Sequence, residues 1–227
     1  MKKFLFSLAV LVLTLGLTKS ASAQDLFSRR LSAGPMGTAG LHITTGDVPD
    51  GWKIKPTMGW SVGALAEVDV SRLVSVDLGL SYLQRGRYFY DQANENNDNR
   101  RINVSYFSIA PMASFKGFLM GFGINMPMSG EQIINKTGGS KDSTVAVPDK
   151  ELKTAIDVKL GGHMPLMRSD QGHLSLLLIA SYDITKPFKD DGVFSVQSES
   201  GRDFAGNDVS LHIGLSYQFN LINLDRP

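Results

Sequence analysis

Residues 209–219, VSLHIGLSYQF, decide the fold. Large apolar side chains alternate along this stretch with small or polar ones. A period of two is that of a β-strand, because a helix would scatter both sets around its axis. The apolar set is Val209, Leu211, Ile213, Leu215, Tyr217 and Phe219, and the other set is Ser210, His212, Gly214, Ser216 and Gln218.

The chemistry of the second face indicates which way the strand is turned. In a soluble barrel the large apolar side chains point inward and charged side chains cover the outside. Here the alternate face is mostly Ser, Gly and Gln, which suits a polar lumen, so the apolar face is predicted to meet lipid.

The same alternation recurs upstream. It is clear in residues 59–70, 73–82, 118–128 and 151–161. It is weaker in residues 101–116, where the apolar face shifts around Pro111 and predicts a bulge or bend, and in residues 173–184, which are apolar on both faces. A first strand near residues 36–44 is inferred mainly by counting, because bacterial single-chain barrels have an even number of strands. The sequence thus predicts an all-β fold, a transmembrane antiparallel up-and-down β-barrel of eight strands.

The connections between these segments alternate in length. Short links at 71–72, 116–117 and 166–172 alternate with long, mostly polar stretches at 45–58, 91–100, 129–150 and 185–206. Short periplasmic turns and long extracellular loops are the layout of a transmembrane barrel. Eleven residues at about 3.3 Å each, tilted by about 40°, span roughly 28 Å, enough for an apolar band of about 25 Å.

The first 23 residues have the three parts of a secretory signal: Lys2 and Lys3, an apolar run at 4–17, and the small-residue exit at 21–23. We therefore predict a cleaved signal peptide at 1–23 and one outer-membrane β-barrel domain at 24–227. Loss of Lys2, Lys3 and Lys19 changes 23 basic against 22 acidic residues into 20 against 22, so no basic surface for nucleic acid is expected. The chain has no cysteine, which excludes disulfides, thiolate metal sites and a lipid-bearing cysteine.

Two motifs resemble the PorT-like outer-membrane β-barrel family, which is common in the envelopes of Gram-negative, Bacteroidetes-type bacteria. Residues 59–70 match its Gly-rich strand ending near an acidic residue, and residues 74–86 match its strand closing on Tyr-x-Gln-(Lys/Arg)-Gly, here Tyr82, Gln84, Arg85 and Gly86. Pro111 and the ending Gly214, Tyr217 and Phe219 also fit the family pattern. The resemblance implies a barrel with varied functions.

The alternation assigns candidate residues to the two surfaces. The lumen-facing charged candidates are Glu67, Asp69, Asp77, Arg85, Asp157 and Lys159, with Arg87 beside them. We expect interior ion pairs that fill a barrel too narrow to conduct, and the alternative is a lumen that conducts or binds small ions. The interfacial aromatic candidates are Tyr82, Tyr88, Tyr90, Tyr217 and Phe219.

Other residue patterns favour no specific chemistry. An outer-membrane hydrolase or acyltransferase would use a histidine beside a nucleophile, and His42 could lie near Ser61 across the first hairpin. The sequence does not establish that the two are within hydrogen-bond reach. The Asn- and Asp-rich residues 91–98, 189–192 and 206–208 match no EF-hand loop and are expected to be solvated turns. We therefore predict no enzyme, no cofactor and no metal.

The expected role is structural or interactive, through the long loops. Its partners would be outer-membrane lipid, the barrel assembly machinery during biogenesis, and envelope proteins. The alternatives are a narrow transport or ligand-binding barrel, an outer-membrane enzyme, and a soluble lipocalin-like periplasmic barrel.

Overall fold

The computed structural model describes residues 30–45, 52–91, 99–135, 143–186, 188 and 206–223. The predicted signal peptide lies outside these residues. The described part is almost entirely antiparallel β-sheet. Its strands are β1 (Arg30–Thr45), β2 (Trp52–Lys55), β3 (Thr57–Ser71), β4 (Val74–Asp91), β5 (Asn99–Phe115), β6 (Phe118–Asn135), β7 (Ser143–Ala146), β8 (Ala155–Arg168), β9 (Gly172–Asp183) and β10 (Asn207–Asn223), with a short 3-10 helix, η1 (Asp149–Glu151), before β8.

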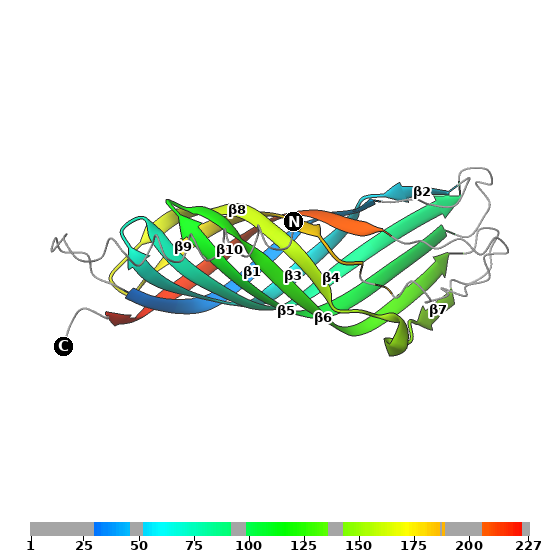
Figure 1. The fold of residues 1–227 in the computed structure, drawn as a ribbon, viewed down its shortest axis with the longest axis horizontal. Helices are drawn as coiled ribbons and strands as arrows, with labels where there is room; N and C mark the ends of the chain where they lie inside the picture. The colour runs from blue at the N-terminus through cyan, green and yellow to red at the C-terminus, as the bar shows by residue number, and fades with distance from the viewer. Residues whose placement is uncertain are drawn as a thin grey trace, which may run out of the picture.

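Eight of the strands close into a barrel (Figure 1). Each strand of the series β1, β3, β4, β5, β6, β8, β9 and β10 pairs antiparallel with the next, and β10 pairs back onto β1. The two remaining strands are short additions, β2 on β4 and β7 on β6. The prediction of an eight-stranded up-and-down barrel is confirmed.

The barrel has its apolar side chains on the outside. Along β10, Leu211 is 54% exposed and Ile213 is 58% exposed, whereas Ser216 is 1% exposed. The same parity holds on β4, where Leu78 is exposed and Asp77 is buried. A soluble barrel would have the reverse arrangement, so this surface is that of a transmembrane barrel of the outer-membrane type.

Tight turns join the strands at one end. At the β5–β6 turn, Lys116 and Gly117 have φ angles of 51° and 84°. Two successive positive φ values form the hairpin turn whose twist matches its flanking strands. An added side chain at Gly117 would begin 2.8 Å from the carbonyl oxygen of His163, so glycine is required there. We call this end the turn end, and the opposite end the loop end.

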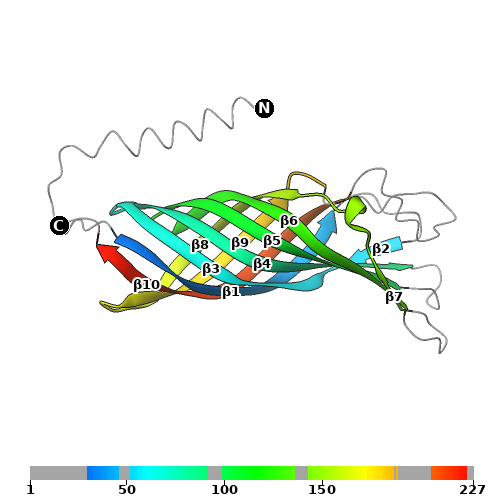
Figure 2. The same ribbon diagram turned by 90° about the horizontal axis from the view of Figure 1, so that it is seen from below.

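The strands extend further into the predicted loops than expected. β6 continues to Asn135, β4 to Asp91, and β2 and β7 lie within segments predicted as loops. The 18 residues of β4, at about 3.3 Å each and about 40° tilt, reach about 45 Å along the axis, against an apolar band of about 25 Å. The extra length forms a sheet of β2, β4, β5, β6 and β7 that projects beyond the barrel, as Figure 2 shows. We call it the loop-end sheet.

The predicted bulge at Pro111 is wrong. Inward parity runs unbroken through β5, because Tyr106, Ser108, Ala110, Met112 and Ser114 are all buried. The pairing of β5 with β4 is also continuous. The register shift lies instead between Ser105 and Tyr106, on the β6 side. The sequence pattern misled because the lumen itself changes from apolar to polar along this strand, while the backbone keeps its parity.

Candidate functional site: the charged lumen and its apolar cap

Arg85 on β4 crosses the lumen and closes it. Its Nη1 donates to both carboxylate oxygens of Asp183 on β9, at 2.7 and 2.9 Å, and its Nη2 donates to Asp157 Oδ2 on β8 at 2.6 Å. Asp157 Oδ2 also accepts from Asn125 Nδ2 at 2.9 Å and from Lys159 Nζ at 3.2 Å. Two cations thus balance two carboxylates in a buried network that links opposite walls of the barrel.

Arg87 forms a second ion pair, one inward-facing position closer to the loop end. Its Nη2 lies 2.9 Å from Asp208 Oδ1 on β10, and its Nε donates to Asp208 Oδ2 at 3.2 Å. Thr44 Oγ1 donates to the same carboxylate at 2.9 Å. Asp208 is therefore buried and paired, so the expectation that residues 206–208 are a solvated turn is wrong at this residue. Residues 189–192 and 92–98 lie outside the described part.

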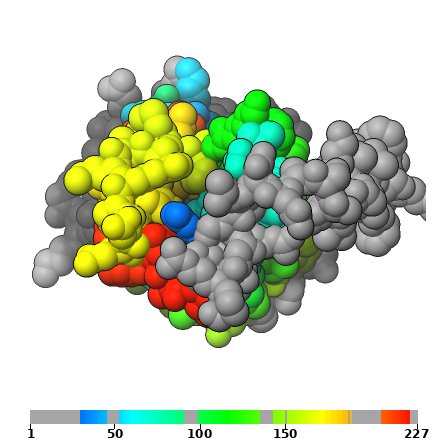
Figure 3. All heavy atoms as spheres, turned by 90° about the vertical axis from the view of Figure 1, so that its left-hand side faces the viewer, coloured from blue at the N-terminus to red at the C-terminus, as the bar shows by residue number. Residues whose placement is uncertain are grey.

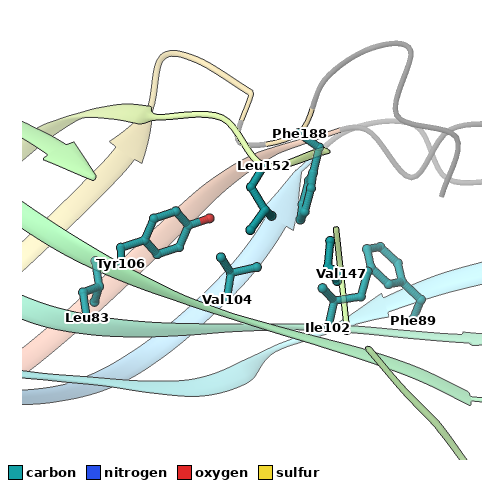
Figure 4. Packing of buried hydrophobic residues seen from close by; sticks show 8 residues of the cluster. All are labelled: Leu83, Phe89, Ile102, Val104, Tyr106, Val147, Leu152 and Phe188. Carbon is teal, nitrogen blue, oxygen red and sulfur yellow. The ribbon is translucent and has the colours of Figure 1, made fainter. Parts of the chain in front are cut away.

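An apolar cluster, which we call the apolar cap, lies toward the loop end of the barrel and contacts the arginines of these ion pairs. Figure 4 shows its eight residues. The Tyr106 ring lies 5.6 Å from the Arg85 guanidinium carbon, and the Phe188 ring lies 4.8 Å from that of Arg87. Leu152 and Phe188, from segments that connect the barrel strands, complete the cluster and are joined by an isolated bridge. Its members are Leu83, Phe89, Ile102, Val104, Tyr106, Val147, Leu152 and Phe188. The lumen is thus closed by a salt-bridged layer under an apolar layer.

A buried pair of histidines lies on the turn side of Arg85. The Nε2 atoms of His42 and His212 are 2.9 Å apart, and His212 Nδ1 is 2.9 Å from Thr38 Oγ1. Thr38 Oγ1 is 2.8 Å from Ser61 Oγ. Gly59 makes room for the pair, because an added Cβ would lie 2.2 Å from His42 Nε2.

Within the described residues, Ser61 and this histidine pair do not form a catalytic triad. Ser61 reaches a histidine only through Thr38, and no carboxylate of the described residues hydrogen-bonds to His42 or His212. A nucleophile needs a base within direct hydrogen-bond reach and a third group that orients the base. The other two histidines lie near the turn end, where His163 contacts Ser114 at 3.4 Å and His173 contacts Glu67 at 3.4 Å.

The predicted lumen-facing charges divide into two groups. Arg85, Asp157 and Lys159 belong to the network that crosses the lumen. Glu67 and Asp77 are buried opposite each other on β3 and β4, toward the turn end. Asp69 is half-buried beyond Glu67, at the mouth of the barrel.

The aromatic candidates lie at different heights. Tyr82 packs against Trp60 with ring centroids 5.3 Å apart, and its hydroxyl donates to Ser105 Oγ at 2.6 Å. Tyr88 and Tyr90 lie further out on β4, where Lys55 Nζ is 5.9 and 4.3 Å from their rings. Tyr217 and Phe219, near the turn end, form an edge contact with centroids 4.8 Å apart. Tyr82 therefore lies between the apolar belt and the two outer tyrosines.

Sequence reasoning missed two central partners, Asp183 and Asp208. Both lie on the inward parity of their strands, in phase with Ser181 and Ser210, whose hydroxyls are 2.6 Å apart. Extending each period-two pattern by one more inward position would have found them.

In the described ranges, no group of three or more histidines and carboxylates is arranged to hold a metal ion. Among those same residues, no helix is long and apolar enough to cross a membrane.

The chain matches no protein-family model and no curated protein. Solved structures with a similar fold include Ail, the attachment invasion locus protein of Yersinia pestis, crystallised with the heparin analogue sucrose octasulfate (11% identity, TM-score 0.42, covering 84% of this chain and 99% of that chain). Another is Neisserial surface protein A (9% identity, TM-score 0.39, covering 84% of this chain and 97% of that chain). A third is OprG from Pseudomonas aeruginosa (9% identity, TM-score 0.30, covering 86% of this chain and 97% of that chain). Likenesses this low carry no argument about activity. The class of the protein, an outer-membrane β-barrel, follows from the closed ring and its apolar exterior.

Proposed function

We propose that residues 24–227, after removal of a signal peptide at 1–23, form a closed-lumen barrel that binds partners through its loop end. In this proposal the barrel is inserted by the assembly machinery, sits in outer-membrane lipid, and meets envelope proteins above the membrane. It is not an enzyme and does not bind nucleic acid. The PorT-like resemblance of residues 59–86 is part of the same proposal.

The closed lumen is the observation that carries this proposal. Arg85 spans the interior, and the apolar cap covers it. A cavity near the middle of the barrel, among the described residues, has a volume of about 50 Å³, room for a few waters only. A barrel of eight strands leaves space for little besides side chains.

The loop-end sheet supports an interaction role. One outward row crosses five strands: Lys55 on β2, Tyr88 on β4, Arg101 on β5, Ile133 on β6 and Thr144 on β7. The next row, with Phe89, faces the cap. Tyrosine and arginine are enriched at protein interfaces, and an extended sheet holds them rigidly.

Photo-cross-linking in intact cells tests this role. A benzoylphenylalanine in place of Tyr88 is expected to give a discrete, light-dependent adduct of protein size, because this position projects from the loop-end sheet. The same group at Ile213, an exposed apolar position on β10, serves as the lipid-facing control and is expected to give none. The absence of any such adduct at Tyr88, or the same adduct at both positions, would contradict an interaction role.

The second candidate is a narrow transport barrel, favoured only by the charged lumen. Stable conductance steps from the purified protein in a planar bilayer would support it over the closed-lumen proposal.

A further inference from the structure

A polar pocket opens at the turn end of the barrel, remote from the apolar cap. It has a volume of about 260 Å³, which is room for several waters or a small molecule. In the view onto this end, atoms of β1 (blue), the β8–β9 hairpin (yellow) and β10 (red) lie side by side, with those of the β3–β4 hairpin (cyan) nearby (Figure 3). Nothing in the proposed function uses this pocket.

The floor of the pocket holds a buried carboxylate, that of Glu67. Asp77, directly opposite Glu67 on the neighbouring strand, is also buried but is not a lining residue. Glu67 Oε2 lies 3.4 Å from His173 Nε2, whereas Asp77 Oδ1 accepts a hydrogen bond from Ser75 Oγ at 3.2 Å. Asp69 is half-buried at the mouth, where the Leu31–Val68 pair brings its strand alongside Arg30. A nearby positive charge stabilises a buried carboxylate, so this floor favours a cationic group beside Glu67.

The rim of the pocket is basic. Arg30 at the start of β1 and Arg168 at the end of β8 line the mouth and are exposed. Neither forms an ion pair with a carboxylate in the described part of the chain. Guanidinium groups bind carboxylates in a two-pronged geometry, so this rim suits an anionic group.

A buried hydroxyl in the wall has no hydrogen-bond partner in the described part of the chain. Ser175 lines the pocket and is 1% exposed, and its Oγ forms no hydrogen bond with any described residue. Ser216 lies directly opposite on β10 and is also 1% exposed. Its Oγ likewise forms no hydrogen bond with any described residue. Buried hydroxyls are normally hydrogen-bonded, so a polar occupant of the pocket would complete this wall.

We propose that the turn-end pocket binds a small zwitterion of amino-acid or dipeptide size. Its ammonium group lies against Glu67 on the buried floor, and its carboxylate lies against Arg30 and Arg168 at the mouth. A buried carboxylate below exposed guanidinium groups selects molecules that carry both charges, one at each end.

Titration calorimetry on the folded, detergent-solubilised protein tests the two charges separately. The probes are L-alanyl-L-alanine, its N-acetyl derivative and its C-terminal amide. Each blocked form is expected to bind at least tenfold more weakly, because each loses one charged hydrogen-bonding end. Equal binding of all three probes, or no binding of the unblocked dipeptide, would overturn the proposal.

Variants identify the contacts. Glu67→Gln is expected to weaken dipeptide binding at least tenfold and to leave binding of the N-acetyl form unchanged. Glu131→Gln, an exposed site on β6 at the loop end, is the matched control. Heat-dependent gel mobility checks that each variant is folded. Arg168→Gln, on the exposed rim, tests the other end if Glu67→Gln does not fold, and unchanged binding in that variant would contradict the assigned pose.

This test is independent of the proposed function. A failure of dipeptide binding leaves the cross-linking result at Tyr88 unaffected, because the two sites are at opposite ends of the barrel. A failure of cross-linking at Tyr88 likewise leaves the dipeptide-binding result unaffected.

Discussion

Replacing Arg85 by methionine is expected to destabilise the barrel by about 3–5 kcal/mol. The change leaves the carboxylates of Asp157 and Asp183 buried with Lys159 as the one remaining cation of the network. Breaking a buried pair by removing one partner is costly, since the remaining charge can neither reach water nor find a new partner. Unfolding by urea in lipid vesicles, followed by heat-dependent gel mobility, measures the loss.

The control for this variant is Arg101→Met. Arg101 is exposed on the outward face of β5 and donates to Asn103 Oδ1 at 3.1 Å. Surface substitutions of this kind change stability by about 0.5 kcal/mol or less. A loss in Arg85→Met no larger than in Arg101→Met would mean that the network does not hold the walls of the barrel together.

Replacing Leu215 by lysine is expected to cost about 2–4 kcal/mol of folding free energy in a bilayer. Leu215 lies in the middle of the exposed apolar positions of β10. A lysine there must place its charge in hydrocarbon, whereas a lysine near the interface reaches water. Denaturant titration in lipid vesicles gives the value.

Leu221→Lys is the matched control, because Leu221 is also exposed but lies near the turn end of β10. Its expected cost is about 0–1 kcal/mol. Equal effects at the two positions would contradict a depth-dependent lipid environment.

The strand pattern of the barrel was predictable from the sequence because lipid and lumen impose opposite chemistry on alternate positions. Leu211 and Ser210 show this on β10, and Leu78 and Asp77 show it on β4. The lengths of the strands were not predictable. Polar residues such as Glu131 and Gln132 continue β6 above the apolar belt. Water surrounds a loop and a strand alike at that height, so polar composition does not distinguish the two.

The partners of the candidate residues required the closed ring. Arg85 could be assigned to the lumen from its parity, but its contact with Asp183 depends on which strand lies opposite β4. The number and stagger of the strands decide which strands face each other across the lumen. The alternation within one strand carries no information about either. The cap was not predictable either. Phe188 lies in a segment without a two-residue period, and Leu152 precedes β8, so its buried position does not follow from the alternation of residues 151–161.

Spin-label accessibility distinguishes an apolar exterior that faces lipid from one that faces water. The chain contains no cysteine, so Leu215→Cys and Arg101→Cys each give a single labelling site in vesicles. We predict that the label at 215 collides with oxygen and is shielded from a water-soluble nickel reagent, and that the label at 101 shows the opposite. Equal access of the nickel reagent to both labels would contradict the membrane-spanning barrel.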